Sequence, residues 1–323
     1  LYVDGNTGER AGFWLLGRLS IPQAAAQKKL PGAKGEIAKL ASGLDCVDAL
    51  CQAPDGSIYL CDSRLYRIYR WDPVSQTLAL LTSQHFQPLS LACDTQGRLL
   101  VVTEYQPVKG STVDGVKELS TDEFGADTGG GCYYPFFSHD RRIRVCALDP
   151  RAPEASMELL PIVPLEEAKP EVLYYPANQW RDSGDMMRSF EKRDTHCYLA
   201  PDGKTAIVHK PALARATGLT PLRPGKAAYL VDEYNKCIVQ VQVEEGFVLS
   251  NPRVWAERGE YGFAMTESGE AYVPDCLLYV FRNGEKVDAI GLGDRPACVL
   301  EAGPDKEYLY ITARRELYAL RLK

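Results

Sequence analysis

The stretch that decides the fold of this chain reads Ala53-Pro54-Asp55-Gly56-Ser57-Ile58-Tyr59-Leu60-Cys61-Asp62. It joins a tight turn, which carries a glycine, to an apolar run that ends in an acid. Related stretches occur around Gly97, Gly203, Gly225, Gly269 and, with a displaced glycine, at 304–306. Several copies are followed by a second alternating run, as at 66–71, 238–243 and 278–281. Tight turns between alternating runs predict a series of β-hairpins.

The spacing of these turns predicts the architecture. Gly56 and Gly97 are 41 residues apart, and Gly225 and Gly269 are 44 apart. A recurrence near forty residues is typical of a β-propeller with one four-stranded blade per repeat. We therefore predict an all-β, six-bladed β-propeller as a single domain over 1–323. A seventh blade is left open, because residues 1–20 also resemble strand pieces.

Two intervals between the turns are irregular and predict insertions. The segment 106–139 is rich in Gly, Asp, Thr and aromatic residues, and 163–193 is first Pro-rich and then polar. The second is expected to hold an irregular blade together with a connecting loop. The short interval from Gly203 to Gly225 predicts one expanded blade that uses both glycines. Because long loops in a compact domain are often functional, the loops 106–139 and 176–193 are predicted to form walls of a binding site.

Composition narrows the classes of partner. Hydrophobic residues make up 45% and charged residues 25% of the chain, as in ordinary globular proteins. A net charge of -6 without a basic block argues against nucleic-acid binding. No apolar run approaches the length of about eighteen residues that a membrane helix needs. The expected partner is a small molecule, and the sequence leaves the oligomeric state open.

The ten cysteines are spread singly along the chain and contain no Cys-x-x-Cys pair. We expect them to be small buried residues without disulfides, which favours a cytoplasmic location. The chain begins at Leu1 rather than at Met. A removed signal peptide, and hence a secreted or periplasmic location, is therefore left open.

Three stretches, 295–314, 53–73 and 229–254, resemble the senescence marker protein-30, gluconolactonase and luciferin-regenerating-enzyme family. The resemblance is most specific at 295–314, which is the last blade in the chain. It implies a six-bladed propeller with a divalent cation, calcium or zinc, on its axis. It also implies hydrolysis of sugar lactones or other esters.

The family's metal ligands are only partly matched. By the spacing of the resemblance, Asp48 stands where the family has a Glu and is the candidate metal ligand. Thr195 stands in place of an Asn, Tyr261 in place of the principal Asp, and Leu89 or Ser90 in place of a further Asn. Calcium takes oxygen ligands, so the resemblance implies a degenerate metal site with weak binding.

Four residues are the candidate catalytic set: Asp48, Glu104, His196 and Tyr261. The innermost strand of each propeller blade begins beside the axis, so residues ahead of different turns are expected to converge there. His196 or a carboxylate would serve as acid or base, and Tyr261 would orient or protonate the substrate. Glu104 is expected at the position in the second blade that matches Asp62 in the first, and it is included because the insertion at 106–139, rather than a tight turn, follows it.

Three further carboxylates, Asp62, Asp232 and Asp275, recur at the end of the second strand of a blade. That regularity predicts a structural role, in which each accepts backbone N–H groups of the following turn. The sequence as a whole predicts a propeller that binds a small polar ligand, a carbohydrate or sugar-derived acid, with hydrolase or lyase chemistry. The alternative is a non-catalytic ligand-binding or scaffold propeller.

Overall fold

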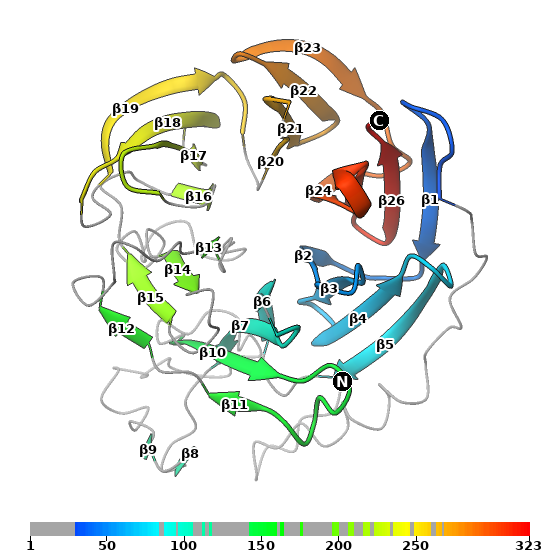
Figure 1. Ribbon diagram of the computed structural model, residues 1–323, viewed down its shortest axis with the longest axis vertical. Helices are drawn as coiled ribbons and strands as arrows, with labels where there is room; N and C mark the ends of the chain where they lie inside the picture. The colour runs from blue at the N-terminus through cyan, green and yellow to red at the C-terminus, as the bar shows by residue number, and fades with distance from the viewer. Residues whose placement is uncertain are drawn as a thin grey trace, which may run out of the picture.

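The computed structural model describes residues 30–83, 87–94, 96–105, 112–113, 116–117, 142–159, 162–164, 175–176, 196–199, 206–209, 216–219, 223–232, 235–245, 249–259, 263–266 and 268–323. These residues form six four-stranded sheets around a common centre, the arrangement of a β-propeller (Figure 1). The predicted all-β propeller fold is confirmed. Residues 1–20, on which a seventh blade would depend, lie outside the described residues.

Three sheets follow the regular order from the centre outward. The first contains β2 (Val47–Gln52), β3 (Ile58–Asp62), β4 (Arg67–Asp72) and β5 (Thr77–Ser83). Another contains β16 (Ala216–Leu219), β17 (Ala227–Asp232), β18 (Cys237–Val243) and β19 (Leu249–Ala256). A third contains β20 (Ala264–Met265), β21 (Glu270–Pro274), β22 (Leu278–Arg282) and β23 (Glu285–Ile290).

The other three sheets depart from simple chain order or continuity. One contains β6 (Gln87–Cys93), β7 (Leu99–Tyr105), β10 (Arg142–Leu148) and β11 (Glu158–Leu159). The next contains β13 (Tyr175–Pro176), β14 (His196–Leu199), β15 (Ala206–His209) and β12 (Ile162–Pro164). The last contains β24 (Pro296–Ala302), β25 (Tyr308–Ala313), β26 (Glu316–Arg321) and β1 (Ile37–Ser42). Within the insertion at 106–139, β8 (Thr112–Val113) pairs with β9 (Val116–Lys117).

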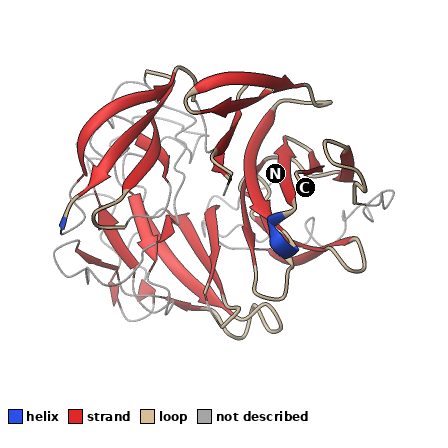
Figure 2. Cartoon of the chain, turned by 45° about the horizontal axis from the view of Figure 1, so that its top comes forward, coloured by secondary structure: helices blue, strands red, loops and turns tan. Residues whose placement is uncertain are grey.

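Strands dominate the described residues (Figure 2). Burial along them follows their place in the blade: all residues of β3 are buried, whereas the outer strand β23 is mostly exposed. Sheets that pack face to face bury their inner strands on both sides, which explains the continuous apolar runs of the sequence repeat. Within the described part of the chain, no helix has the length and apolarity that a membrane span requires.

The turn glycines recur because the turns need a left-handed backbone. Gly56, Gly97, Gly225 and Gly269 have φ values between +74° and +86°, a region that costs glycine little. In the last copy the turn is the 3-10 element η5 (Pro304–Lys306), preceded by Gly303 at φ 95°. The glycine is displaced there because a different turn type joins β24 to β25.

The prediction that Gly203 and Gly225 serve one expanded blade is wrong. β14 and β15, which flank Gly203, belong to one sheet, whereas β16 and β17, which flank Gly225, belong to the next. The interval is short because the outermost strand of the earlier sheet, β12, precedes the other three in sequence and pairs parallel with β15. Among the described residues, no fourth strand therefore separates β15 from β16.

The ring is closed by its two ends. Strand β1 pairs antiparallel with β26, with Ile37 opposite Leu320 and Ser42 opposite Glu316. The C-terminal strands of the chain therefore pack beside a segment from its N-terminal side. This pairing covers the edge that β26 would otherwise expose.

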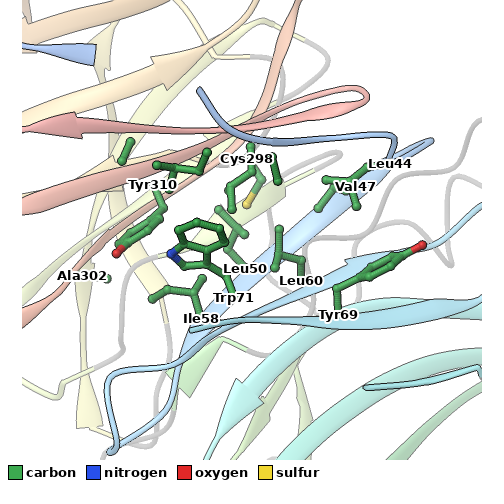
Figure 3. Close-up of a cluster of buried hydrophobic side chains, with 14 of the residues drawn as sticks. Leu44, Val47, Leu50, Ile58, Leu60, Tyr69, Trp71, Cys298, Ala302 and Tyr310 are labelled. Atoms are coloured by element: carbon green, nitrogen blue, oxygen red, sulfur yellow. The ribbon is translucent and has the colours of Figure 1, made fainter. Parts of the chain in front are cut away.

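A buried cluster joins this closing sheet to the first sheet (Figure 3). Trp71 of β4 lies beside Ile58 and Tyr310, and is 1% exposed. Leu40 of the closing strand belongs to the same cluster and is also 1% exposed. The cluster thus ties residues from both ends of the ring into one core.

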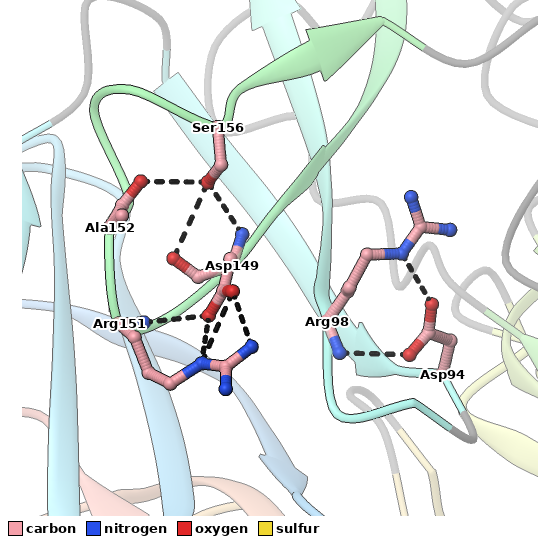
Figure 4. A network of polar contacts seen from close by, with 6 residues as sticks. All are labelled: Asp94, Arg98, Asp149, Arg151, Ala152 and Ser156. Atoms are coloured by element: carbon pink, nitrogen blue, oxygen red, sulfur yellow. Dashed lines mark hydrogen bonds and ion pairs between the residues drawn. The ribbon is translucent and has the colours of Figure 1, made fainter.

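Carboxylates organise the turns at the far face, the face of the ring that carries the repeat turns such as 53–57. The fully buried Asp94 carboxylate accepts hydrogen bonds from the backbone N–H of Gln96 and from Arg98, whose Nε lies 2.8 Å away (Figure 4). Asp149 is bound by Arg151 in the same way, with Nη2 at 2.7 Å from Oδ2. These carboxylates are engaged in holding local turns.

No disulfide occurs among the eight described cysteines: Cys46, Cys51, Cys61, Cys93, Cys146, Cys237, Cys276 and Cys298. Cys51, Cys61, Cys146, Cys237 and Cys298 are buried. The expectation of small buried cysteines without bridges is confirmed for these five positions. Cys132 and Cys197 lie outside the residues whose side chains are described.

The closing strand should carry a measurable share of the stability. Leu40→Ala should lower the free energy of unfolding by about 2–5 kcal/mol, because it leaves a cavity in the cluster between the first and last sheets. Urea unfolding measures this change. The control is Val74→Ala: Val74 is 89% exposed, so its loss should cost no more than about 0.5 kcal/mol. Equal stability of the two variants would show that the ring does not depend on β1.

Candidate functional site

The innermost strands β2, β6, β13, β16, β20 and β24 lie nearest the centre of the ring (Figure 1). In the first sheet β2 begins where β3 ends and β4 begins, since Asp62 pairs with both Val47 and Arg67. We call the face on which the innermost strands begin the mouth face. It lies opposite the far face with its turn carboxylates.

Asp48 lies at a β-bulge one residue into β2. The pairing of β2 with β3 shifts between Val47 and Ala49. The same shift occurs at Leu89 in β6, at Gly218 in β16 and at Ala297 in β24. A bulge re-aims a side chain and is frequent beside binding sites. Asp48 therefore lies at a bulge that recurs at the matching position in four innermost strands.

Asp62 holds the segment that leads into this bulge. Its carboxylate is fully buried and accepts backbone hydrogen bonds from Asp45 at 2.8 Å, Leu65 at 3.1 Å and Cys46 at 3.3 Å. Burial raises the pKa of the Asp62 carboxyl above its ordinary range, and the three N–H donors oppose that rise. The predicted structural role of Asp62 is confirmed.

Thr312 fixes the same segment from the neighbouring sheet. Its hydroxyl donates to the backbone carbonyl of Val47 at 3.1 Å and accepts from the backbone N–H of Cys298 at 3.0 Å. Thr312 is fully buried. The backbone next to Asp48 is thus held from within its own blade and across the blade boundary.

Arginines surround the carboxylates of the mouth face. Asp45, directly before β2, faces Arg64 of the β3–β4 turn at 3.5 Å and Arg315 of the β25–β26 turn at 3.9 Å. Both arginine side chains are 72% exposed. Arg314, in the same turn as Arg315, forms an ion pair with Asp294 at 3.8 Å. These ion pairs form an arc of arginines that extends toward β24.

The arc ends at a tighter cluster in the sheet of β20–β23. Asp275, directly after β21, accepts from Arg258 Nη1 at 2.6 Å and from Arg295 Nη2 at 3.3 Å. The guanidinium of Arg258 also lies 4.2 Å from the ring centroid of Tyr279, a cation–π contact. The prediction that Asp275 acts through turn N–H groups missed these two arginine partners. The side chain of Asp232 lies outside the described residues.

The predicted catalytic residues are placed only in part. Asp48 lies in β2, Glu104 in β7, and His196 begins β14, where it pairs with His209. Their side chains, and the whole of Tyr261 and Thr195, lie outside the described residues. Their convergence remains a prediction.

The prediction that Glu104 matches Asp62 is wrong by one residue in the register. Asp62 pairs with Val47, just before the bulge of β2, and the residue that pairs just before the bulge of β6 is Thr103. Glu104 lies one residue beyond and pairs with Gln87. A shift of one residue places a side chain on the opposite face of a strand. Asp62 and Glu104 are therefore not equivalent positions.

The residues that sequence reasoning missed are the arginines of the mouth face and Thr312. A signal was present, because Arg64 and Arg315 each follow by two residues the last position of a second strand, Asp62 or Ala313. Their ion-pair partners come from other turns and from the adjacent sheet. Spacing along one chain does not reveal such partners.

An axial metal, which the resemblance implies, does not fit the bulge positions. Among these positions Asp48 alone has a side-chain oxygen, because the others are Leu89, Gly218 and Ala297. Calcium needs six to eight oxygen ligands. The described residues also contain no group of three or more His, Cys, Asp or Glu side chains that could hold an ion. The described residues therefore offer no set of side-chain ligands for an axial ion.

No family model and no curated protein match the sequence. Solved structures match nearly all of it. A gluconolactonase from Xanthomonas campestris has a TM-score of 0.60 at 14% identity, covering 93% of this chain and 97% of that chain. A luciferin-regenerating enzyme has a TM-score of 0.52 at 14% identity, covering 88% and 94%. The calcium-binding protein regucalcin from Agrobacterium tumefaciens has a TM-score of 0.51 at 13% identity, covering 91% and 95%. At these identities the similarity establishes a shared propeller fold.

Thr312 should be a stabilising contact between blades. Thr312→Val keeps the shape of the side chain but leaves the Val47 carbonyl and the Cys298 N–H without this hydroxyl, which should cost about 1–3 kcal/mol of unfolding free energy. Urea unfolding measures the loss. Thr77→Val is the control, because its hydroxyl bonds only an exposed Ser75 hydroxyl among its described contacts. An unchanged Thr312→Val stability would remove this residue from the support of the bulge.

Proposed function

We propose that the mouth face binds a small anionic ligand, a sugar-derived acid or its lactone, and hydrolyses the lactone or a related ester. The observation that carries this proposal is the arc of arginines, Arg64, Arg315, Arg314, Arg295 and Arg258, beside the starts of three innermost strands. The chain as a whole has a net charge of -6. Guanidinium groups that bind carboxylates are suited to an acidic ligand.

The pairing within the arc supports an anionic ligand. Asp45 faces two arginines, and so does Asp275. Within each of these two ion-pair groups, the guanidinium groups therefore outnumber the carboxylates. The exposure of Arg64 and Arg315 leaves their guanidinium groups in reach of a ligand from solvent.

Hydrolysis in this proposal uses the predicted catalytic residues. Neutral His196 accepts a proton from water as the water oxygen bonds to the lactone carbonyl carbon. The proton then goes to the ring oxygen, which leaves as an alcohol when its bond to that carbon breaks. Tyr261 donates a hydrogen bond to the carbonyl oxygen, and Asp48 or Glu104 can replace His196 as the base. The matched gluconolactonase fold supports lactones as the first substrates to test.

A second function, binding without catalysis, is favoured by one observation. Leu89, Gly218 and Ala297 occupy bulge positions without polar side chains. A propeller without catalytic activity would keep the arginine arc and bind sugar acids without turnover. A panel of neutral and carboxylate-bearing sugar lactones, with the corresponding acids as binding probes, separates the two functions.

His196 and Asp48 should both be needed for activity. Single replacement by Ala should lower turnover or ligand affinity at least tenfold, equivalent to about 1.4 kcal/mol, with the fold intact. The control for Asp48→Ala is Asp288→Ala, which removes the same charge from the exposed outer strand β23. If both site variants keep full activity on a verified substrate, the catalytic site lies elsewhere.

The arginine arc should set the preference for charge. The double variant Arg64→Ala with Arg315→Ala should weaken binding of a carboxylate-bearing ligand roughly threefold or more and leave a neutral analogue unaffected, because exposed ion pairs contribute little individually. Titration calorimetry at low salt measures both ligands. Arg151→Ala, an exposed arginine of the far face, is the matched control. Equal losses for charged and neutral ligands would contradict an electrostatic role.

A further inference from the structure

Two cysteines of neighbouring blades lie against each other. Cys51 is in β2 and Cys93 ends β6, and their Sγ atoms are 3.6 Å apart. Both strands are innermost strands, so this contact crosses the boundary between the first two blades. Roughly 1.5 Å of approach separates this contact from the length of a disulfide bond.

The surroundings make the two thiols unequal. Cys51 is 7% exposed and packs in the apolar cluster that includes Tyr59, Cys61 and Leu99. Cys93 is only partly buried at the edge of this cluster. Burial and the neighbouring Cys93 raise the pKa of the Cys51 thiol well above its usual range. Because Cys93 is the more exposed of the two thiols, it is the one that an oxidant in solution meets first.

We propose that Cys51 and Cys93 form a dithiol site that a hydroperoxide converts into a disulfide between the first and second blades. The Cys93 sulfur attacks the peroxide oxygen, the O–O bond breaks, and Cys93 becomes a sulfenic acid while an alcohol, or water from hydrogen peroxide, leaves. The Cys51 sulfur then bonds to the Cys93 sulfur, its proton joins the departing hydroxide, and water leaves. Two thiols are oxidised and one peroxide is reduced.

The geometry makes this pair the preferred site over more accessible thiols. Cys276 is the exposed cysteine of the described residues, and its described contact is with the Tyr279 hydroxyl at 3.9 Å. Exposure alone would direct oxidation to Cys276, where a sulfenic acid has no thiol within the described contacts. A resolving thiol at 3.6 Å instead converts the product at Cys93 into a bond. This inference does not rest on the proposed hydrolase function.

The test uses the full chain, reduced and then freed of reductant, with hydrogen peroxide as the probe at near-stoichiometric amounts. Thiol titration in denaturant should fall by two groups, and non-reducing peptide mapping should find Cys51 linked to Cys93, with full reversal by dithiothreitol. Cys276→Ala should form the same link. A link between other cysteines, or oxidation to sulfinic acid without any link, would overturn the proposal.

Single variants test the order of events. In Cys51→Ala the Cys93 sulfenic acid should persist and be trapped by dimedone, whereas Cys93→Ala should show no dimedone adduct at Cys51. Replacement by Ala suits these apolar surroundings, and circular dichroism confirms that each variant is folded. A dimedone adduct on Cys51 in Cys93→Ala would contradict the assignment of Cys93 as the first thiol oxidised.

Discussion

The structure depends on the pairing of β1 with β26. The last sheet reaches four strands only because its outermost strand comes from the N-terminal side of the chain, and this strand covers the edge that β26 would otherwise expose. The side chains reinforce the backbone pairing: Lys39 of β1 forms an ion pair with Glu316 of β26, and Leu40 enters the cluster around Trp71. Closure therefore couples residues that are far apart in sequence to the core of the first blade.

The same closure positions the mouth face. Thr312 reaches from the closing sheet to the Val47 carbonyl, and Arg315 reaches from the next turn to Asp45. Asp62 completes the support from within the first sheet. The position of Asp48 is thus determined by contacts on both sides of the boundary where the ring closes. A propeller opened at this boundary would lose the support of its candidate site.

The two faces of the ring use carboxylates differently. On the far face Asp94 and Asp149 are occupied by nearby backbone N–H groups and by an arginine close in sequence. On the mouth face Asp45 and Asp275 instead meet pairs of arginines from separate connections. Local turn capping needs only short-range geometry. The mouth face gathers charge from several blades, which is why the binding site is proposed there.

The amino-acid sequence by itself determined the hairpins, the glycine turns and the propeller, because these follow from short-range periodicity and from backbone conformations that glycine adopts at low cost. It also marked Asp62 as structural and Asp48 as a residue ahead of a turn. It misassigned the interval from Gly203 to Gly225, since the earlier position of β12 in the chain leaves no local trace. Only the tertiary structure decided the bulge at Asp48, the arginine arc and the contact of Cys51 with Cys93. Each of these depends on register or on neighbours from another blade, and packing between distant segments sets both.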